Sequence, residues 1–190
     1  WTVAIGATPP ISSEQAYTGT TSVKIDANSL GTIKLTHSFG GSLTNVAVEG
    51  RHYDDTSIVD QADAFTVYDG SNLIRIGNDN DYTNIAYYDT AFHETSVPRQ
   101  TGWNHIKICI TSSGADGYYR GIQIFTDNPT ITQIDSIALA AWDSTYHSVV
   151  YYDTILVRKY ADPEPSISVG EEETSAQQNL IVTGCYFSTG

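Results

Sequence analysis

Apolar and polar residues alternate along most of this chain, and this alternation limits the possible folds more than any other feature. Segments such as 64–68 and 104–111 place apolar side chains at every second position, which is the period of a β-strand with one buried face. Helical spacing is almost absent. Asp-Gly at 69–70 and at 116–117 separates pairs of such segments and favours tight hairpin turns. The pattern predicts about ten to twelve short antiparallel strands, with a longer one over 42–52 and none over 90–103.

Many short strands with turn residues between them are typical of a two-sheet antiparallel sandwich of jelly-roll type. With 190 residues, the chain can bury a sizeable core without disulfides or metals. We therefore predict an all-β fold in which residues 1–160 form a jelly-roll β-sandwich. Residues 161–190 are predicted to be an acidic, proline-containing linker followed by an apolar C-terminal strand extension.

The charge balance excludes several kinds of partner. The chain has 22 acidic and 9 basic residues, a formal net charge of −13. Nucleic acids and anionic membrane surfaces are bound through clustered Lys and Arg, so neither is an expected partner. The carboxylates suit divalent cations better, although solubility in a salty or hot medium explains them equally well. No run of eighteen apolar residues is present, and we expect no membrane insertion.

Composition also indicates where the protein acts. The sequence contains no methionine and begins at Trp1, so we expect a processed mature protein or an excised domain. Lys and Arg are sparse, whereas Thr, Ser and Tyr are plentiful. This profile is typical of exported bacterial or archaeal β proteins, and it predicts an extracellular or cell-surface location.

Six phrases carry a resemblance to a known class of domain, and they occur in the expected order. They are 1–3, 11–19, 21–25, 98–105, 151–160 and 161–172. The fourth, Pro-Arg-Gln-Thr-Gly-Trp-Asn-His, is similar to the Arg-x-x-Gly-Trp-His step before a central strand. Together they resemble the concanavalin-like and laminin-G-like jelly-roll domains of bacterial and archaeal extracellular proteins, among them non-catalytic carbohydrate-binding modules. The resemblance implies a fold more firmly than a function.

The resemblance also implies a structural calcium site. In such domains an aspartate at the place of Asp153, on the closing strand, holds Ca²⁺ with oxygens near Glu14 and Gly19. The acidic partner that usually precedes the opening tryptophan is missing here. The alternative for Asp153 is a hydrogen-bonded carboxylate at a strand end.

A second group of oxygen ligands follows from the residues alone. Asp79 and Asp81 belong to the run Asn-Asp-Asn-Asp at 78–81, and such a turn is chemically suited to Ca²⁺. Asx-rich turns also stabilise themselves through side-chain to backbone hydrogen bonds, which is the simpler explanation. Calcium is the one cofactor that the sequence suggests.

Sugar binding requires exposed aromatic platforms beside polar groups. Trp142 and Tyr146 lie between two predicted strands, and Tyr118 with Arg120 forms another candidate. In adjacent tyrosine pairs such as 87–88, one member faces outward if the pair lies in a strand. Tyrosines that pack in a core or an interface are the alternative. These features predict a polysaccharide partner.

The C-terminal segment predicts a different function. Residues 179–187 are apolar and strand-like, and Leu180, Val182 and Phe187 could fill a groove in a neighbouring copy. In domains of the resembled class, a short strand or acidic segment usually precedes the opening tryptophan. That segment is missing from this sequence, whereas the strand-like segment at its end is additional, and the two could complement each other. Head-to-tail exchange of this kind produces fibres when it does not close. The alternative is that the tail folds back onto its own sandwich.

The two cysteines bear on the same question. The isoleucines of 105–111 alternate with Cys109, which places Cys109 on the outer face of its strand. A disulfide with Cys185 would attach the tail across that face, within one chain or between copies. Two free thiols are the alternative.

No catalytic pattern is found in the sequence. Glycosidases of the resembled fold share a Glu-x-Asp-x-x-Glu strand, which does not occur here, and the histidines lack metal-ligand spacing. We predict a secreted, non-enzymatic protein that assembles with copies of itself into a fibre by strand exchange. The alternative is a carbohydrate-binding module of a larger extracellular enzyme or adhesin.

Overall fold

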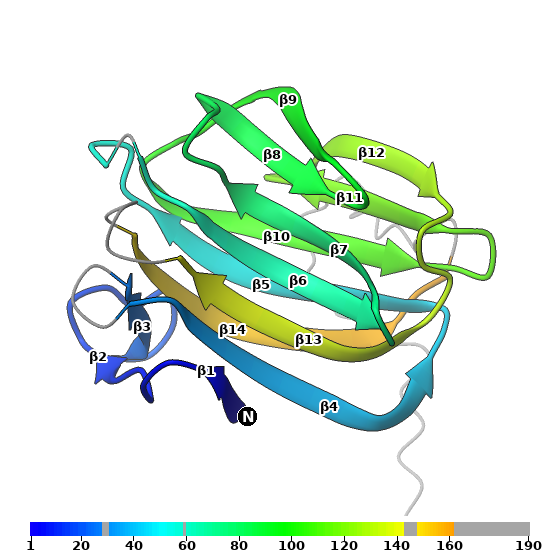
Figure 1. Ribbon diagram of the computed structural model, residues 1–190, viewed down its shortest axis with the longest axis horizontal. Helices are drawn as coiled ribbons and strands as arrows, with labels where there is room; N and C mark the ends of the chain where they lie inside the picture. Colours follow the sequence, from blue (N-terminus) through cyan, green and yellow to red (C-terminus); the bar gives the residue numbers. More distant parts are fainter. Residues whose placement is uncertain (28–30, 59, 143–147, 162–190) are drawn as a thin grey trace, which may run out of the picture.

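The computed structural model describes residues 1–27, 31–58, 60–142 and 148–161, which form two seven-stranded antiparallel sheets (Figure 1). Sheet A contains, in spatial order, β1 (Thr2–Ile5), β4 (Ile33–Leu43), β13 (Ile134–Ala141), β6 (Asp63–Asp69), β7 (Asn72–Asn78), β8 (Asn84–Tyr88) and β9 (Phe92–Pro98). Sheet B contains β12 (Ile122–Asn128), β11 (Ala115–Tyr119), β10 (Gly102–Ile110), β5 (Val46–Asp54), β14 (Val149–Lys159), β3 (Ser22–Asp26) and β2 (Ile11–Ser12). This confirms the predicted jelly-roll sandwich.

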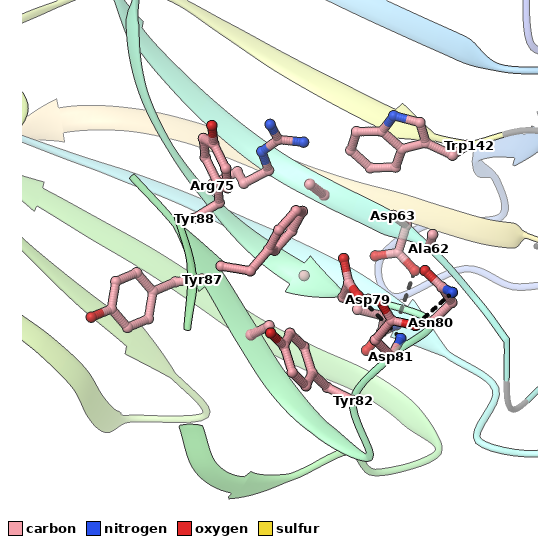
Figure 2. Close-up of a pocket in the computed structure, with 15 residues that line it drawn as sticks. Ala62, Asp63, Arg75, Asp79, Asn80, Asp81, Tyr82, Tyr87, Tyr88 and Trp142 are labelled. Carbon is pink, nitrogen blue, oxygen red and sulfur yellow. Dashed lines mark hydrogen bonds between the residues drawn. The ribbon is translucent and has the colours of Figure 1, made fainter. Parts of the chain in front are cut away.

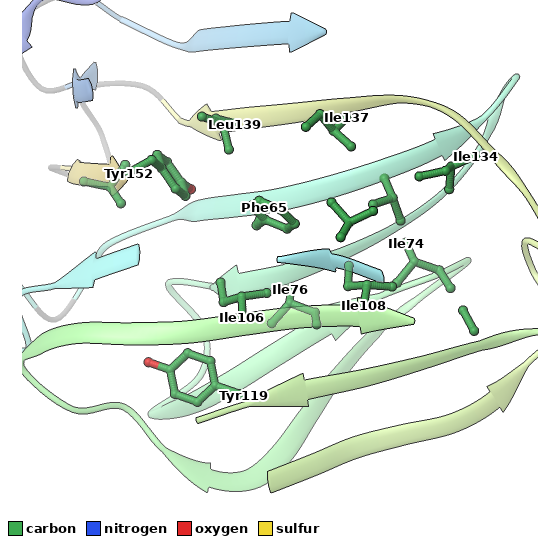
Figure 3. Packing of buried hydrophobic residues seen from close by; sticks show 14 of the residues in the cluster. Phe65, Ile74, Ile76, Ile106, Ile108, Tyr119, Ile134, Ile137, Leu139 and Tyr152 are labelled. Carbon is green, nitrogen blue, oxygen red and sulfur yellow. The ribbon is translucent and has the colours of Figure 1, made fainter. Parts of the chain in front are cut away.

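The core lies between the two sheets and is dominated by β-branched residues. Ile74 and Ile76 of β7 face Ile106 and Ile108 of β10, and all four are buried (Figure 3). Branched side chains fit a pleated, half-buried surface. Because alternate residues point to opposite faces, the positions between these isoleucines are turned to the outer faces of the sandwich.

One predicted hairpin turn is confirmed and one is wrong. Gly70, with φ +60°, joins β6 to β7 as predicted. The Asp-Gly at 116–117 instead lies inside β11, and the turn is at Arg120-Gly121, where both residues have positive φ. A Cβ at Gly117 would lie 2.1 Å from the ring of Phe125. Glycine is therefore required at 117 for close packing rather than for the turn.

Two further strand boundaries differ from the prediction. The single strand expected over 42–52 is two strands, because Asn45 has φ +52° and reverses the chain between β4 and β5. Strand β9 was not predicted because its sequence is largely polar. It forms the edge of sheet A beside β8. Edge strands need fewer apolar residues than central ones.

Strand β14, the last described strand, ends at Lys159. The backbone N–H of Tyr160 donates to the carbonyl of Asn45 at 2.8 Å, one residue after the end of β14. The predicted linker and C-terminal strand extension, including Leu180, Val182 and Phe187, lie outside the described residues and stay predictions. No helix of the described part is long and apolar enough to cross a membrane.

Candidate functional site

A depression of about 470 Å³ lies on the outer face of sheet A. The register places Ala64 of β6 beside Gly77 of β7, and Gly77 beside Ala86 of β8. All three alternate with core residues and therefore point outward. Because they carry at most one side-chain carbon, they form a floor on which a ligand can lie. Binding pockets for small ligands commonly have volumes of about 300–1,000 Å³.

Aromatic rings around a guanidinium form one wall of the depression (Figure 2). The guanidinium carbon of Arg75 lies 4.3 Å from the ring centre of Tyr88, 5.3 Å from that of Trp142 and 5.6 Å from that of Phe92. Tyr88 and Phe92 also contact each other edge to face. Burial lowers the pKa of Arg75 from its usual value, but the group stays charged because arginine ionises far above neutrality.

Local backbone bonding fixes Trp142 at this wall. Trp142 follows β13, and its backbone N–H donates to the carbonyl of Ala62 at 3.0 Å. Ala62 in turn donates its N–H to the hydroxyl of Ser148 at 2.8 Å. These bonds fix the backbone of Trp142 at the end of β13, from which its ring contacts the Arg75 guanidinium.

The predicted Asx turn forms the opposite wall (Figure 2). The backbone N–H of Asp81 donates to Asp79 Oδ1 at 3.1 Å, and Asn80 Nδ2 donates to Asp81 Oδ1 at 3.2 Å. These are the hydrogen bonds of a self-stabilised Asx turn, and calcium binding through Asp79 and Asp81 stays a prediction. Each carboxylate has further acceptor capacity toward the depression.

A buried ionic network supports the floor from inside the sandwich. His52 Nε2 lies 2.9 Å from Asp63 Oδ1, an ion-pair distance, although the two atoms lack the alignment of a hydrogen bond. Gln61 and Asn78 donate to Asp63 Oδ2 at 2.5 and 2.9 Å. Burial opposes both charges, but their mutual attraction outweighs it, so the pKa of His52 is raised and the pKa of Asp63 is lowered.

A second buried pair continues this network. Arg99 Nε and Nη2 donate to the two carboxylate oxygens of Asp54 at 3.0 and 2.6 Å. The Asp54 side chain is fully buried and that of Arg99 is 7% exposed. Arg99 Nη2 also reaches Gln61 Oε1 at 3.4 Å and so links the two pairs. Bidentate pairing of this kind is the strong form of a charge-assisted hydrogen bond.

The structure separates the residues that were predicted to bind carbohydrate. Trp142 lines the depression on sheet A, together with Asp79 and Asp81, which were predicted as metal ligands. Tyr118 is instead on the outer face of sheet B, where Lys107 Nζ lies 4.6 Å from its ring centre. Arg120 is exposed in the β11–β12 turn of that sheet. Tyr146 lies outside the described residues.

The residues of the predicted calcium site bind groups of the protein itself. The backbone N–H groups of Tyr17 and Thr18 donate to the Asp153 carboxylate at 2.9 and 3.0 Å. Burial raises the pKa of Asp153, but these hydrogen bonds outweigh it and the net shift is downward. Glu14 accepts from the Tyr151 hydroxyl at 2.6 Å and pairs with Lys24 at 3.0 Å.

Gly19, the third member of the predicted site, has φ +67°, which glycine adopts readily. In the described part of the chain no three His, Cys, Asp or Glu side chains are grouped as metal ligands. Calcium binding through Asp153, Glu14 and Gly19 stays a prediction.

Cys109 lies on β10 between core isoleucines and is fully buried. Its register partners are Ala47 of β5 and Asp116 of β11. Cys185 lies outside the described residues, so the disulfide between these two cysteines stays a prediction.

Sequence reasoning missed three members of the aromatic wall: Arg75, Tyr88 and Phe92. A signal for Tyr88 was present in the tyrosine pair 87–88, and the prediction that one member faces outward is confirmed. Tyr87 packs inward, with its ring centre 4.7 Å from that of Phe125. Phe92 belongs to the unpredicted strand β9, and Arg75 resembled any polar residue of an alternating strand.

A second hollow lies where the two sheets expose their edges at β1 and β2. Its volume is about 510 Å³, and its apolar lining includes Trp1, Val3, Ile11, Val23, Leu35 and Ile155. Ile11 is 66% and Trp1 is 55% exposed. Such exposure of large apolar side chains beside edge strands is a feature of interaction surfaces.

Neither family models nor curated proteins match this sequence. Solved structures do match the fold. One is the carbohydrate-binding module CBM66 from Bacillus subtilis, with a TM-score of 0.55 and 12% identity over 83% of this chain and 94% of the module. Another is the globular domain of T. cruzi calreticulin, with a TM-score of 0.56 and 8% identity over 82% and 80% of the two chains.

A third match is described as "Prominent members of the human gut microbiota express endo-acting O-glycanases to initiate mucin breakdown". Its TM-score is 0.55, with 9% identity over 74% of this chain and 80% of that chain. At these identities the likeness concerns the fold. It confirms the predicted resemblance to concanavalin-like jelly-roll domains at the level of architecture.

Proposed function

We propose that this protein binds carbohydrate in the depression on the outer face of sheet A. The observation that carries the proposal is the combination of a floor of small residues and a wall that holds Trp142, Tyr88 and Phe92 around Arg75. Aromatic faces stack on the apolar face of a sugar ring. Arg75 on one side, and Asp79 and Asp81 on the other, supply donors and acceptors for sugar hydroxyls.

The shared fold of a carbohydrate-binding module supports this proposal, since that module aligns over 94% of its own length. We further propose an extracellular location and a non-catalytic role. Two carboxylates of a glycosidase must differ in protonation state. Asp79 and Asp81 accept hydrogen bonds within one turn, and the Glu-x-Asp-x-x-Glu strand of glycosidases does not occur in the sequence.

Replacing Trp142 by alanine is expected to weaken glycan binding about ten- to hundredfold, because a central aromatic contact is removed. Binding is measured by affinity electrophoresis and calorimetry against a panel of neutral and acidic polysaccharides. Tyr118→Ala is the matched control, since it removes an aromatic residue on sheet B. If Tyr118→Ala weakens glycan binding and Trp142→Ala does not, the binding site lies on sheet B and not on sheet A. If the wild-type protein binds no glycan of the panel, the proposal is refuted.

Strand exchange is a second candidate function, and the apolar hollow at β1 and β2 favours it. This hollow lies between two edge strands whose outer backbone groups could pair with an added strand. The segment that would occupy it is apolar: Leu180 and Val182 would share one face of a strand, and Phe187 is a further large apolar residue. Self-association into a fibre would follow if each tail entered the next copy.

Deletion of residues 179–190 is expected to convert assemblies of the full chain into monomers if strand exchange operates. Light scattering after size-exclusion chromatography, together with negative-stain microscopy, measures this directly. Ile11→Asp provides an independent test because it places a charge at the exposed rim of the hollow. A full chain that is monomeric, or assemblies that survive both changes, would contradict the exchange.

A further inference from the structure

The guanidinium of Arg75 lacks an anionic partner among the described residues. The described residues contain no carboxylate within ion-pair distance of its guanidinium, whereas Lys24, Arg99 and Arg158 each pair with an acidic side chain. The chain has 22 acidic residues for 9 basic ones, so an acidic partner would be easy to supply. Arg75 Nε is buried without a hydrogen-bond partner in the described structure. Because this atom has almost no accessible surface, a ligand in the depression would meet the terminal Nη groups of the guanidinium.

The surrounding rings hold the guanidinium in place rather than neutralising it. Tyr88, Trp142 and Phe92 lie 4.3 to 5.6 Å from its central carbon. Aromatic faces attract a cation without supplying a hydrogen-bond acceptor at its edge. The planar donor groups of an arginine match a carboxylate in two parallel hydrogen bonds. Preorganisation of this kind lowers the entropic cost of binding.

The two walls of the depression carry opposite charges, because Asp79 and Asp81 lie on the wall opposite Arg75. Asp79 and Asp81 present carboxylate oxygens, which accept hydrogen bonds from hydroxyls and repel another carboxylate. A ligand with a carboxylate at one end and hydroxyls at the other can satisfy both walls in one orientation only. A hexuronic acid unit of a polysaccharide has this chemistry, and its ring can lie on the floor formed by Ala64, Gly77 and Ala86.

We infer that the depression selects acidic polysaccharides, with Arg75 pairing with the carboxylate of a uronic acid unit while Trp142 contacts the sugar ring. This inference rests on the proposed carbohydrate-binding function and specifies its ligand class. Since the carboxylate pairs with a partly buried arginine, its loss costs more than the loss of a solvent-exposed ion pair.

The test compares polysaccharides that differ only in the charge of the carboxyl group. Polygalacturonate and polyglucuronate are titrated against the protein beside their fully methyl-esterified forms, and dissociation constants are measured by calorimetry. The acid forms are expected to bind about ten- to hundredfold more tightly than the esters. Arg75→Gln is expected to remove this preference, because it weakens binding of the acid form far more than binding of the ester, and Arg75→Lys is expected to retain part of the preference.

Arg120→Gln is the matched control, because it removes the same charge from an exposed turn of sheet B, and it should keep the preference. Equal binding of acid and ester, or a preference that survives Arg75→Gln, overturns the inference. So does binding of neutral glycans alone. In these cases loss of binding in Trp142→Ala still supports the carbohydrate site. If the wild-type protein binds no glycan of either kind, the inference and the proposed function both fail. Thermal unfolding followed by circular dichroism verifies that each variant is folded.

Discussion

Replacing Arg99 by methionine is expected to lower the free energy of unfolding by about 3–5 kcal/mol. The change leaves the Asp54 carboxylate without the two hydrogen bonds that it accepts at 2.6 and 3.0 Å. Asp54 is fully buried, so water cannot replace the lost donors. Methionine fills a similar volume, and the loss therefore reports the unpaired charge rather than a cavity. Urea denaturation followed by tryptophan fluorescence measures the difference.

Lys24→Met is the control for this experiment, since it removes a cation whose partner Glu14 is exposed. Exposed ion pairs contribute little because water and salt screen them. We expect an unfolding midpoint close to that of the wild type. If Arg99→Met and Lys24→Met shift the midpoint equally, the network around Asp54 does not stabilise the sandwich as described.

Replacing Gly77 by alanine is expected to lower the free energy of unfolding by about 3 kcal/mol or more. An added Cβ would lie 2.0 Å from the carbonyl oxygen of Asp63 and 2.8 Å from the Cα of Ala64. Both are backbone atoms of β6, so the clash is relieved only if β6 and β7 separate. The floor of the depression would move with them, and glycan binding is expected to weaken in parallel.

Gly41→Ala is the matched control because nothing lies within 4 Å of its added Cβ and it belongs to strand β4. We expect little change or a small gain in stability, since alanine loses less backbone freedom on folding. Chemical denaturation of both variants is compared with that of the wild type. A Gly77→Ala protein as stable as Gly41→Ala would show that the close approach of β6 and β7 is not required.

The fold could be predicted from local pattern because alternation and turn chemistry act over a few residues. The isoleucines at 106, 108 and 110 were placed in the core by their spacing, and they are buried there. The turn at 120–121 could not be predicted in this way, because the Asp-Gly signal at 116–117 pointed elsewhere. What fixes Gly117 in a strand is contact with Phe125, which depends on the pairing of two strands.

The candidate site was predicted only in fragments. Trp142 was expected to bind sugar and Asp79 to bind metal, but no local signal places them beside the same depression. Their proximity results from the order of β13, β6, β7 and β8 in sheet A. Arg75 has the sequence signature of an ordinary outward-facing strand residue, and its three aromatic neighbours come from separate strands and a loop. Long-range pairing creates this site.

The central claim is that carbohydrate binds on the outer face of sheet A. The most direct measurement is a nuclear magnetic resonance titration of the isotope-labelled protein with the polysaccharide fragment that binds best in the panel. The account predicts that shifts concentrate at Arg75, Tyr88 and the Trp142 indole, with little change at Tyr118. Shifts confined to Tyr118 and its neighbours on sheet B, or saturating binding without any change at Trp142, would contradict it.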